Sequence, residues 1–206
     1  MDSERPYPDR RTVLETLGAG TVLVLAGCVE DEGADEDEPA DDQDETGEDT
    51  DGETVPLDQS TEFPAGEECA VCNMIAAEYP EWNAQLAHED ETRTYFCSSG
   101  CMSAYYVEPG RFGGPDSPIA AVWVTDYETG ELIDASSAYF VRVTDSDHVD
   151  DVMKMNPAPF ADRADAEAFV EEFEEYDDED IITLEEFDRE LAVQYRGQFF
   201  EDDGGS

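Results

Sequence analysis

Two close pairs of cysteines constrain this chain more than any other feature of its sequence. Cys69 and Cys72 form a Cys-x2-Cys motif, and Cys97 and Cys101 form a Cys-x3-Cys motif after a spacer of 24 residues. Residues 102–206 contain no cysteine. Three explanations are open for such pairs: disulfides in an exported protein, a four-thiolate zinc site, or a site for a thiophilic ion such as Cu(I).

Methionines beside the cysteines help to choose among these explanations. Met74 lies two residues after Cys72, and Met102 directly follows Cys101. A thioether adds nothing to a zinc site but suits Cu(I), although core packing is the better explanation for Met102. His88 could supply a nitrogen ligand, but acidic residues follow it, and a solvated hairpin end is the stronger interpretation.

The cysteine-containing segment predicts a loop, a β-hairpin and a helix. Residues 67–75 have no clear hydrophobic period and predict the loop, and the pattern of residues 82–97 predicts the hairpin. Ser98 or Ser99 can cap the helix that follows. Cys101 would then lie in the first helical turn, where free N–H groups and the helix dipole stabilise a thiolate.

The second half predicts the same kind of unit without cysteine. The expected elements are strands over residues 119–125, 131–134, 137–143 and 181–184, and helices starting at Asp162 or Asp165 and at residue 185. We therefore predict an α+β fold of two subdomains, with a disordered tail over residues 201–206. The first subdomain is residues 63–117, which carry the cysteines, and the second is residues 118–200.

A methionine-rich segment interrupts this second half. Met153 and Met155 are separated by Lys154 and followed by Pro157 and Pro159, which hold the segment extended. Paired methionines in an exported loop are candidate ligands for a soft metal ion. Hydrophobic packing at a domain seam explains the same spacing equally well.

The charge of the chain excludes one class of function and indicates a habitat. The 206 residues include 56 acids and 10 bases, a formal net charge of −46. Nucleic-acid binding needs clustered Lys and Arg and is therefore excluded. Residues 59–206 hold 36 acids and 7 bases, or 29 net negative charges, whose mutual repulsion molar salt screens. The sequence thus predicts a halophilic protein; a calcium site is disfavoured because no calcium-loop motif is present.

The N-terminus predicts an export signal over residues 1–27. Arg10 and Arg11 precede an apolar run of 15 residues, which is too short for a membrane span of ~20 residues. The adjacent arginines indicate the twin-arginine route. Cys28 ends a lipobox-like Leu-Ala-Gly-Cys sequence and is the predicted lipidation site; a short anchor with an incidental cysteine is the alternative. Residues 28–62 then form a disordered acidic tether on the extracytoplasmic face of the cell membrane.

An ordered set of short motifs runs through most of residues 64–188. It comprises Cys69-Ala-Val-Cys72-Asn-Met74, Tyr95-Phe96, Met102, Tyr105-Tyr106, Val124-Thr-Asp126-Tyr127, Met153-Lys-Met155, Phe160 and Ala164-Asp-Ala166. No single motif is specific. Together with the lipoprotein-type signal, however, the set resembles the NosL family, which are membrane-anchored copper chaperones for nitrous oxide reductase.

The resemblance implies both a fold and a ligand set. The fold would be two small ββαβ-like domains, related to the organomercurial lyase fold. The family binds one Cu(I) ion through sulfur, and its motifs fall here on Cys69, Cys72 and Met74, and on Met153 with Met155 beside it.

Four positions depart from the family pattern. Asn73 and Lys154 stand where the family usually has glycine; asparagine tolerates left-handed backbone geometry best among the other residues. Cys97 and Cys101 stand where many relatives carry acidic residues. Three roles are open for these two cysteines: additional ligands, replacement of Met153, or a separate zinc-like knuckle.

The resemblance implies a metallochaperone rather than an enzyme. Its partners would be nitrous oxide reductase and the copper-maturation transporter of that enzyme, in denitrification. A zinc-stabilised binding module built on the four cysteines is the alternative. A thiol–disulfide enzyme using Cys69 and Cys72 is disfavoured because the motif does not open a helix, and lyase activity would rest on fold analogy alone.

Overall fold

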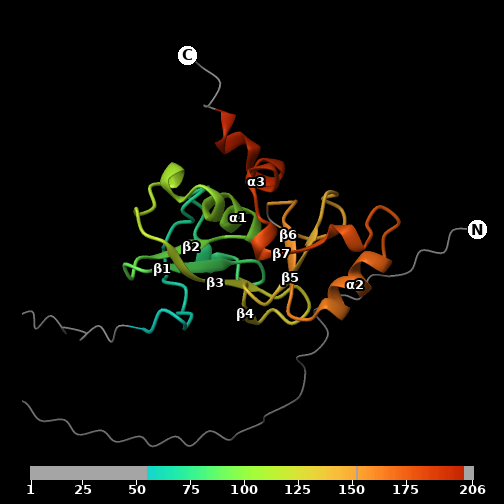
Figure 1. Ribbon diagram of the computed structural model, residues 1–206, viewed down its shortest axis with the longest axis horizontal. Helices are drawn as coiled ribbons and strands as arrows, with labels where there is room; N and C mark the ends of the chain where they lie inside the picture. Colours follow the sequence, from blue (N-terminus) through green and yellow to red (C-terminus); the bar gives the residue numbers. More distant parts are fainter. Residues whose placement is uncertain (1–54, 152, 202–206) are drawn as a thin grey trace, which may run out of the picture. The chain divides into compact units, whose positions relative to one another are not determined.

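A four-stranded antiparallel sheet forms the first part of the fold (Figure 1). The computed structural model describes residues 55–151 and 153–201. The strands of this sheet are β1 (Ala84–His88), β2 (Arg93–Phe96), β3 (Ile119–Thr125) and β4 (Leu132–Asp134), in the order β2-β1-β3-β4. All five residues of β1 are buried, as expected for a strand paired on both sides.

The β1–β2 hairpin forms where the sequence predicts it. The His88 N–H donates to the Thr92 carbonyl at 2.8 Å, and the Asp90 side chain accepts from the Thr92 N–H at 3.1 Å. Glu91 closes the turn at φ 71°. The hairpin therefore delivers the end of β2 to the helix that follows.

Helix α1 (Ser99–Val107) begins directly after β2, and Ser98 caps it as predicted. The Ser98 Oγ accepts a hydrogen bond from the Cys101 N–H at 3.4 Å, so Cys101 lies in the first helical turn. Seven residues of α1, from Ser99 to Tyr105, are buried because the helix packs between the sheet and helix α3 (Arg189–Arg196).

The second sheet has three antiparallel strands in the order β6-β5-β7. The strands are β5 (Tyr139–Arg142), β6 (Pro157–Phe160) and β7 (Ile181–Thr183), and helix α2 (Arg163–Glu171) follows β6. The sequence predicts an extended segment at Pro157 and Pro159 but not a strand. Proline fits here because β6 is an edge strand, where a missing N–H leaves no partner unsatisfied.

Both sheets repeat one ββαβ order, which confirms the α+β fold class. In each, the first strand lies between its antiparallel partner and the strand that follows the helix: β2-β1-β3 and β6-β5-β7. The sheets divide in residues 135–138, between β4 and β5, rather than at residues 117 and 118. The difference arises because β3 is the strand that completes the first unit on the free edge of β1.

The remaining elements are short or start later than expected. The described residues include five 3-10 turns, four before or between the other elements and one after the last helix: η1 (Ala76–Glu78), η2 (Pro109–Phe112), η3 (Asp178–Asp180), η4 (Leu184–Glu186) and η5 (Gly197–Phe199). The last helix was expected from residue 185, but η4 occupies that position and α3 begins after its N-cap, Asp188. The Asp188 side chain accepts from the Leu191 N–H at 2.9 Å.

Residues 55–62 lie against the hairpin, although the sequence places them in the disordered tether. Thr61 exchanges backbone hydrogen bonds with the Gln85 side chain at 2.9 and 2.7 Å. The Arg93 guanidinium donates to two carbonyls of this segment at 2.9 Å each. The predicted boundary at residue 62 was drawn from composition, which carries no information on contacts with Gln85 and Arg93.

Three predictions lie outside the described residues: the export signal with Cys28, the tether up to residue 54, and the tail from residue 202. Among the residues that the structure does describe, no helix has the length and apolarity to cross a bilayer.

Candidate metal centre

A tight loop before β1 holds the first cysteine pair. The Cys69 N–H donates to the Met74 carbonyl at 2.7 Å, and the Asn73 N–H donates to the Cys69 carbonyl at 2.9 Å. Asn73 adopts φ 63°, so the turn keeps the left-handed geometry that glycine favours. The loop thereby places Cys69 and Cys72 on the side that faces α1.

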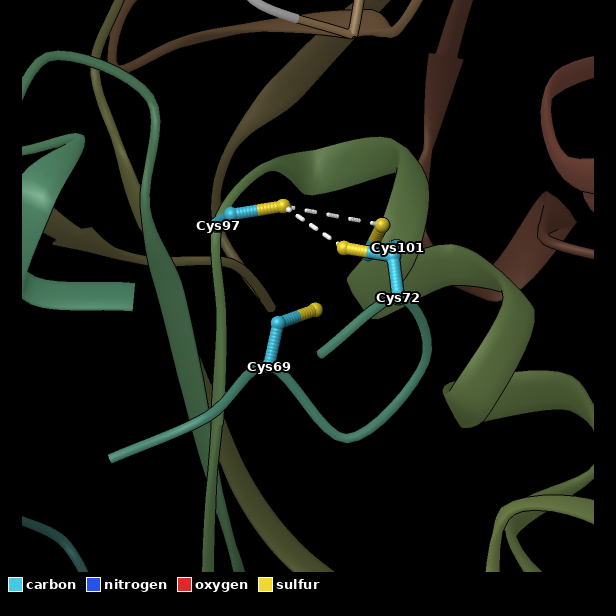
Figure 2. Close-up of side chains that lie close together, drawn as sticks. All are labelled: Cys69, Cys72, Cys97 and Cys101. Atoms are coloured by element: carbon cyan, nitrogen blue, oxygen red, sulfur yellow. Dashed lines mark hydrogen bonds between the residues drawn. The ribbon is translucent and has the colours of Figure 1, made fainter. Parts of the chain in front are cut away.

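The second pair meets the first from the opposite side. Cys97 follows the last residue of β2, and Cys101 projects from the first turn of α1. Figure 2 shows all four side chains pointing toward one another from the loop, the end of the strand and the helix. The fold therefore gathers all four predicted cysteines into one cluster.

The distances in this cluster fit a single metal ion. The Sγ atoms of Cys72 and Cys97 are 3.3 Å apart, those of Cys97 and Cys101 are 3.8 Å apart, and all four lie within 4.8 Å of one another. Four thiolates at about 2.3 Å from a tetrahedral ion would be about 3.8 Å apart. Cys69, Cys72, Cys97 and Cys101 are all free thiols, so none of them forms the disulfide that was one of the three explanations.

Burial distinguishes the four cysteines. Cys69, Cys97 and Cys101 are 0% exposed, whereas Cys72 is half-buried. A surface pocket of about 350 Å³ opens beside the cluster, and its lining includes Glu67, Glu68, Cys69 and Asn73. The pocket lining holds these two glutamates and one basic residue, Arg93, and this excess of negative charge favours the approach of a cation.

The four thiols cannot ionise independently at these distances. Hydrogen bonds with Cys101, Cys72 and Cys97 lower the pKa of Cys69, and a hydrogen bond with Cys101 lowers the pKa of Cys72. The pKa values of Cys97 and Cys101 are raised, chiefly through Cys101 and Cys69 respectively. A bound cation removes this conflict because it stabilises all four as thiolates.

Arg196 is a member of the site that sequence reasoning missed. Its Nε donates to the Cys101 Sγ at 3.1 Å, and its side chain is almost completely buried. The two residues are 95 positions apart, and a basic residue at the end of a helix ordinarily indicates only a favourable interaction with the helix dipole. No local signal in the sequence could have joined it to the cysteines.

The predicted methionine ligands lie around the core that contains the cysteines. Met74, Met153 and Met155 are half-buried and pack against this core. Met102 is fully buried within it, in agreement with core packing. The fold thus places both methionine motifs against the hydrophobic core that contains the cysteines, and their ligation stays a prediction.

In the Met153 loop, Lys154 stands where the resemblance implies a glycine, and its backbone has the left-handed geometry that glycine favours. Lys154 adopts φ 70°, in the left-handed region. The Asp151 carboxylate accepts the Met153 N–H, and the Asp151 carbonyl accepts the Lys154 N–H at 2.9 Å. Burial raises the pKa of Asp151. These bonds hold a strained turn around the two methionines.

His88 is neither a solvated residue nor an available ligand. It is 0% exposed, and its Nδ1 and Nε2 lie 2.9 Å from the Ser117 carbonyl and 3.0 Å from the Tyr105 hydroxyl. Sequence reasoning placed it at an exposed hairpin end because acidic residues follow it. The side chain instead points inward from β1 and packs edge-on against the Tyr105 ring.

The fold and the site together define a small α+β protein with a four-cysteine cluster that can hold a metal ion. The chain belongs to the NosL family, whose family model matches residues 60–181, more than half of the chain. A solved structure, the copper chaperone NosL from Shewanella denitrificans, shares the fold with a TM-score of 0.53. The two are 22% identical over 66% of this chain and 99% of that one. No curated protein sequence matches the chain.

Proposed function

We propose that this protein is a Cu(I)-binding chaperone rather than an enzyme. The observation that carries the proposal is the group of four free cysteines, all within 4.8 Å, in a chain of the NosL family. Thiolate and thioether sulfur are the ligands that Cu(I) prefers. The solved relative with the same fold is named a copper chaperone.

The partial exposure of one ligand, Cys72, supports transfer rather than permanent storage. Cu(I) is stable with two or three sulfur ligands, so four cysteines offer more than one arrangement. Cys72 is the cysteine of the cluster that solvent reaches. A partner thiol or thioether would therefore replace Cys72 first, and the ion would pass by ligand exchange.

We further propose that the chaperone works outside the cell membrane, held there by a lipid on Cys28. The export signal and the acidic tether of the sequence support this location. The copper would be delivered for assembly of the nitrous oxide reductase copper centre, together with the copper-maturation transporter of that enzyme. The family membership supports this choice of partner.

Metal competition in the full chain tests copper binding. The protein, reduced and in molar salt, should take Cu(I) from a chromogenic chelator, and excess Zn²⁺ should not displace it. The Cys69→Ser/Cys72→Ser variant should lose this ability, and Met74→Leu should weaken it. Met102→Leu is the matched control, because that thioether lies in the core. Binding of Zn²⁺ more tightly than Cu(I) would refute the proposal.

A genetic experiment tests delivery. Deletion of the gene should lower nitrous oxide reduction at limiting copper, and added copper should restore it. A Cys28→Ser chain should lose membrane association and complement poorly. Normal nitrous oxide reduction in the deletion strain at limiting copper would contradict the proposed partner.

One observation favours a second function, a zinc-stabilised binding module. Three of the four cysteines are fully buried, which is typical of closed structural zinc sites. In that case EDTA would unfold the protein, because metal binding would supply folding energy. A chaperone must instead keep its fold without metal, and circular dichroism after chelation distinguishes the two.

A further inference from the structure

Arg196 is the largest fully buried side chain among the described residues. Its guanidinium donates to five acceptors: Cys101 Sγ at 3.1 Å, Ser98 Oγ at 2.8 Å, the Met155 carbonyl at 3.1 Å, the Tyr195 carbonyl at 2.7 Å and Asn156 Oδ1. Every nitrogen of the guanidinium therefore has a partner. The bonds to Cys101 and Ser98 join Arg196 to the start of α1, those to Met155 and Asn156 join it to the methionine loop, and the fifth stays within α3.

The charge of this side chain has an unusual counterpart. Arginine stays protonated in proteins, and a buried charge is strongly destabilising unless an opposite charge meets it. None of the ion pairs found in the described part of the chain includes Arg196. Among its five acceptors, the Cys101 sulfur is the one that can carry a negative charge. The buried Asp151 carboxyl also interacts electrostatically with Arg196, but no hydrogen bond joins the two side chains in the described part of the chain. A metal ion bound to Cys101 keeps that sulfur a thiolate.

The first turn of α1 leaves space for the Arg196 guanidinium because it contains Gly100, which has no side chain. A Cβ at Gly100 would lie 2.8 Å from Arg196 Nη2 and would collide with Asn156 Oδ1. The Gly100 N–H instead donates to Asn156 Oδ1 at 3.1 Å. The missing side chain in the first turn of α1 thus lets Arg196 and Asn156 reach the turn that carries Cys101.

The same bonds connect the cluster to the methionine loop. Met155 and Asn156 accept from Arg196, and the Ser99 Oγ donates to the Pro157 carbonyl at 2.6 Å. The segment around Met153 and Met155 is therefore held on the first turn of α1. Arg196 is the one side chain among these links that also contacts a cysteine sulfur.

We propose that Arg196 is a positioning residue of the metal centre. It offsets part of the negative charge of the metal–thiolate cluster and couples metal occupancy to the packing of the Met153–Asn156 segment. This inference rests on metal binding by the cysteine cluster, as in the proposed function, but it holds for zinc as well as copper.

The experiment measures metal affinity and hydrogen exchange in the full chain. Cu(I) and Zn²⁺ are each titrated against chelators, and backbone exchange is followed over residues 153–160 with and without metal. Metal should protect this segment in the unchanged protein. Arg196→Gln should weaken both metals by roughly 10–100-fold and abolish the metal-dependent protection. Arg196→Lys should restore part of the affinity but not the protection, because it keeps the charge and loses the fork.

Arg189→Gln is the matched control, since Arg189 is a half-exposed arginine on the same helix. It should leave affinity and protection unchanged. Wild-type affinity in a folded Arg196→Gln would overturn the proposal. If that variant does not fold, the unchanged protein still tests the proposal. Hydrogen-exchange rates over residues 153–160 that are the same with and without metal would also overturn the proposal. Tight zinc with weak copper would overturn the chaperone function and leave the role of Arg196 standing.

Discussion

At the scale of single residues, Gly100 matters because the Asn156 and Arg196 side chains lie where its Cβ would be. Gly100→Ala should lower the free energy of unfolding by about 1–3 kcal/mol, because the new methyl group displaces Asn156 and Arg196. Urea unfolding in molar salt measures the change. The control is Gly110→Ala, whose Cβ would meet no atom within 4 Å. Equal effects at the two glycines would refute the explanation.

Lys154 provides a second test at this scale. Its φ of 70° is unfavourable for any side chain with a Cβ. Lys154→Gly should therefore stabilise the protein by up to about 1 kcal/mol, seen as a higher thermal midpoint. Lys154→Ala keeps the strain while removing the amine, and should show no such gain. If Lys154→Ala raised the thermal midpoint as much as Lys154→Gly, the cause would be loss of the lysine side chain rather than relief of backbone strain.

The residues of the site differ in how far sequence could predict them. The four cysteines could be found because their spacing is a local signal, and Asn73 because its left-handed tendency is intrinsic. Arg196 could not be found, since its contact with Cys101 depends on how α3 packs against α1. The prediction that His88 is exposed was wrong for a related reason. The face of the sheet to which a hairpin residue points depends on the strand register, and the register is fixed by which face is buried in the folded protein.

At the scale of elements, the start of α1 is the critical point. The Ser98 Oγ accepts from the Cys101 N–H and from Arg196 Nη2. Ser98→Ala should remove a cap and leave a buried donor unsatisfied, at a loss of about 2–3 kcal/mol. Asp162→Ala is the comparison, because this N-cap of α2 makes no side-chain cap bond. Its loss should stay within about 0.5 kcal/mol in the same urea titration. A larger loss at Asp162 would contradict the ranking.

Most elements could be predicted from local pattern, and their partners could not. The strand over residues 119–125 and the cap at Ser98 follow from hydrophobic runs and capping chemistry. The assignment of β3 to the first sheet needs the free edge of β1, which local pattern does not contain. Strand β6 was missed because prolines oppose a strand except at an edge, and edges exist only in the assembled sheet.

At the scale of the whole molecule, we expect the net charge of −46 to make the stability of the fold depend on salt. The thermal midpoint should rise with KCl, and most of the rise should come below ~1 M, where the Debye length falls from ~10 Å to ~3 Å. Circular dichroism melts measure it. Choline chloride should act like KCl if screening is the cause. A midpoint that ignores salt, or responds to potassium alone, would contradict the explanation.

The packing of α3 against α1 also sets the order of events during synthesis. Cys69, Cys72, Cys97 and Cys101 leave the ribosome early, but Arg196 follows Cys69 by 127 residues. A growing chain therefore displays four bare thiols with no buried cation beside them. The complete centre exists only after the last helix has docked. On the proposed role of Arg196, metal is bound by the folded protein, and a truncation before α3 that keeps every cysteine leaves the cluster without its buried arginine.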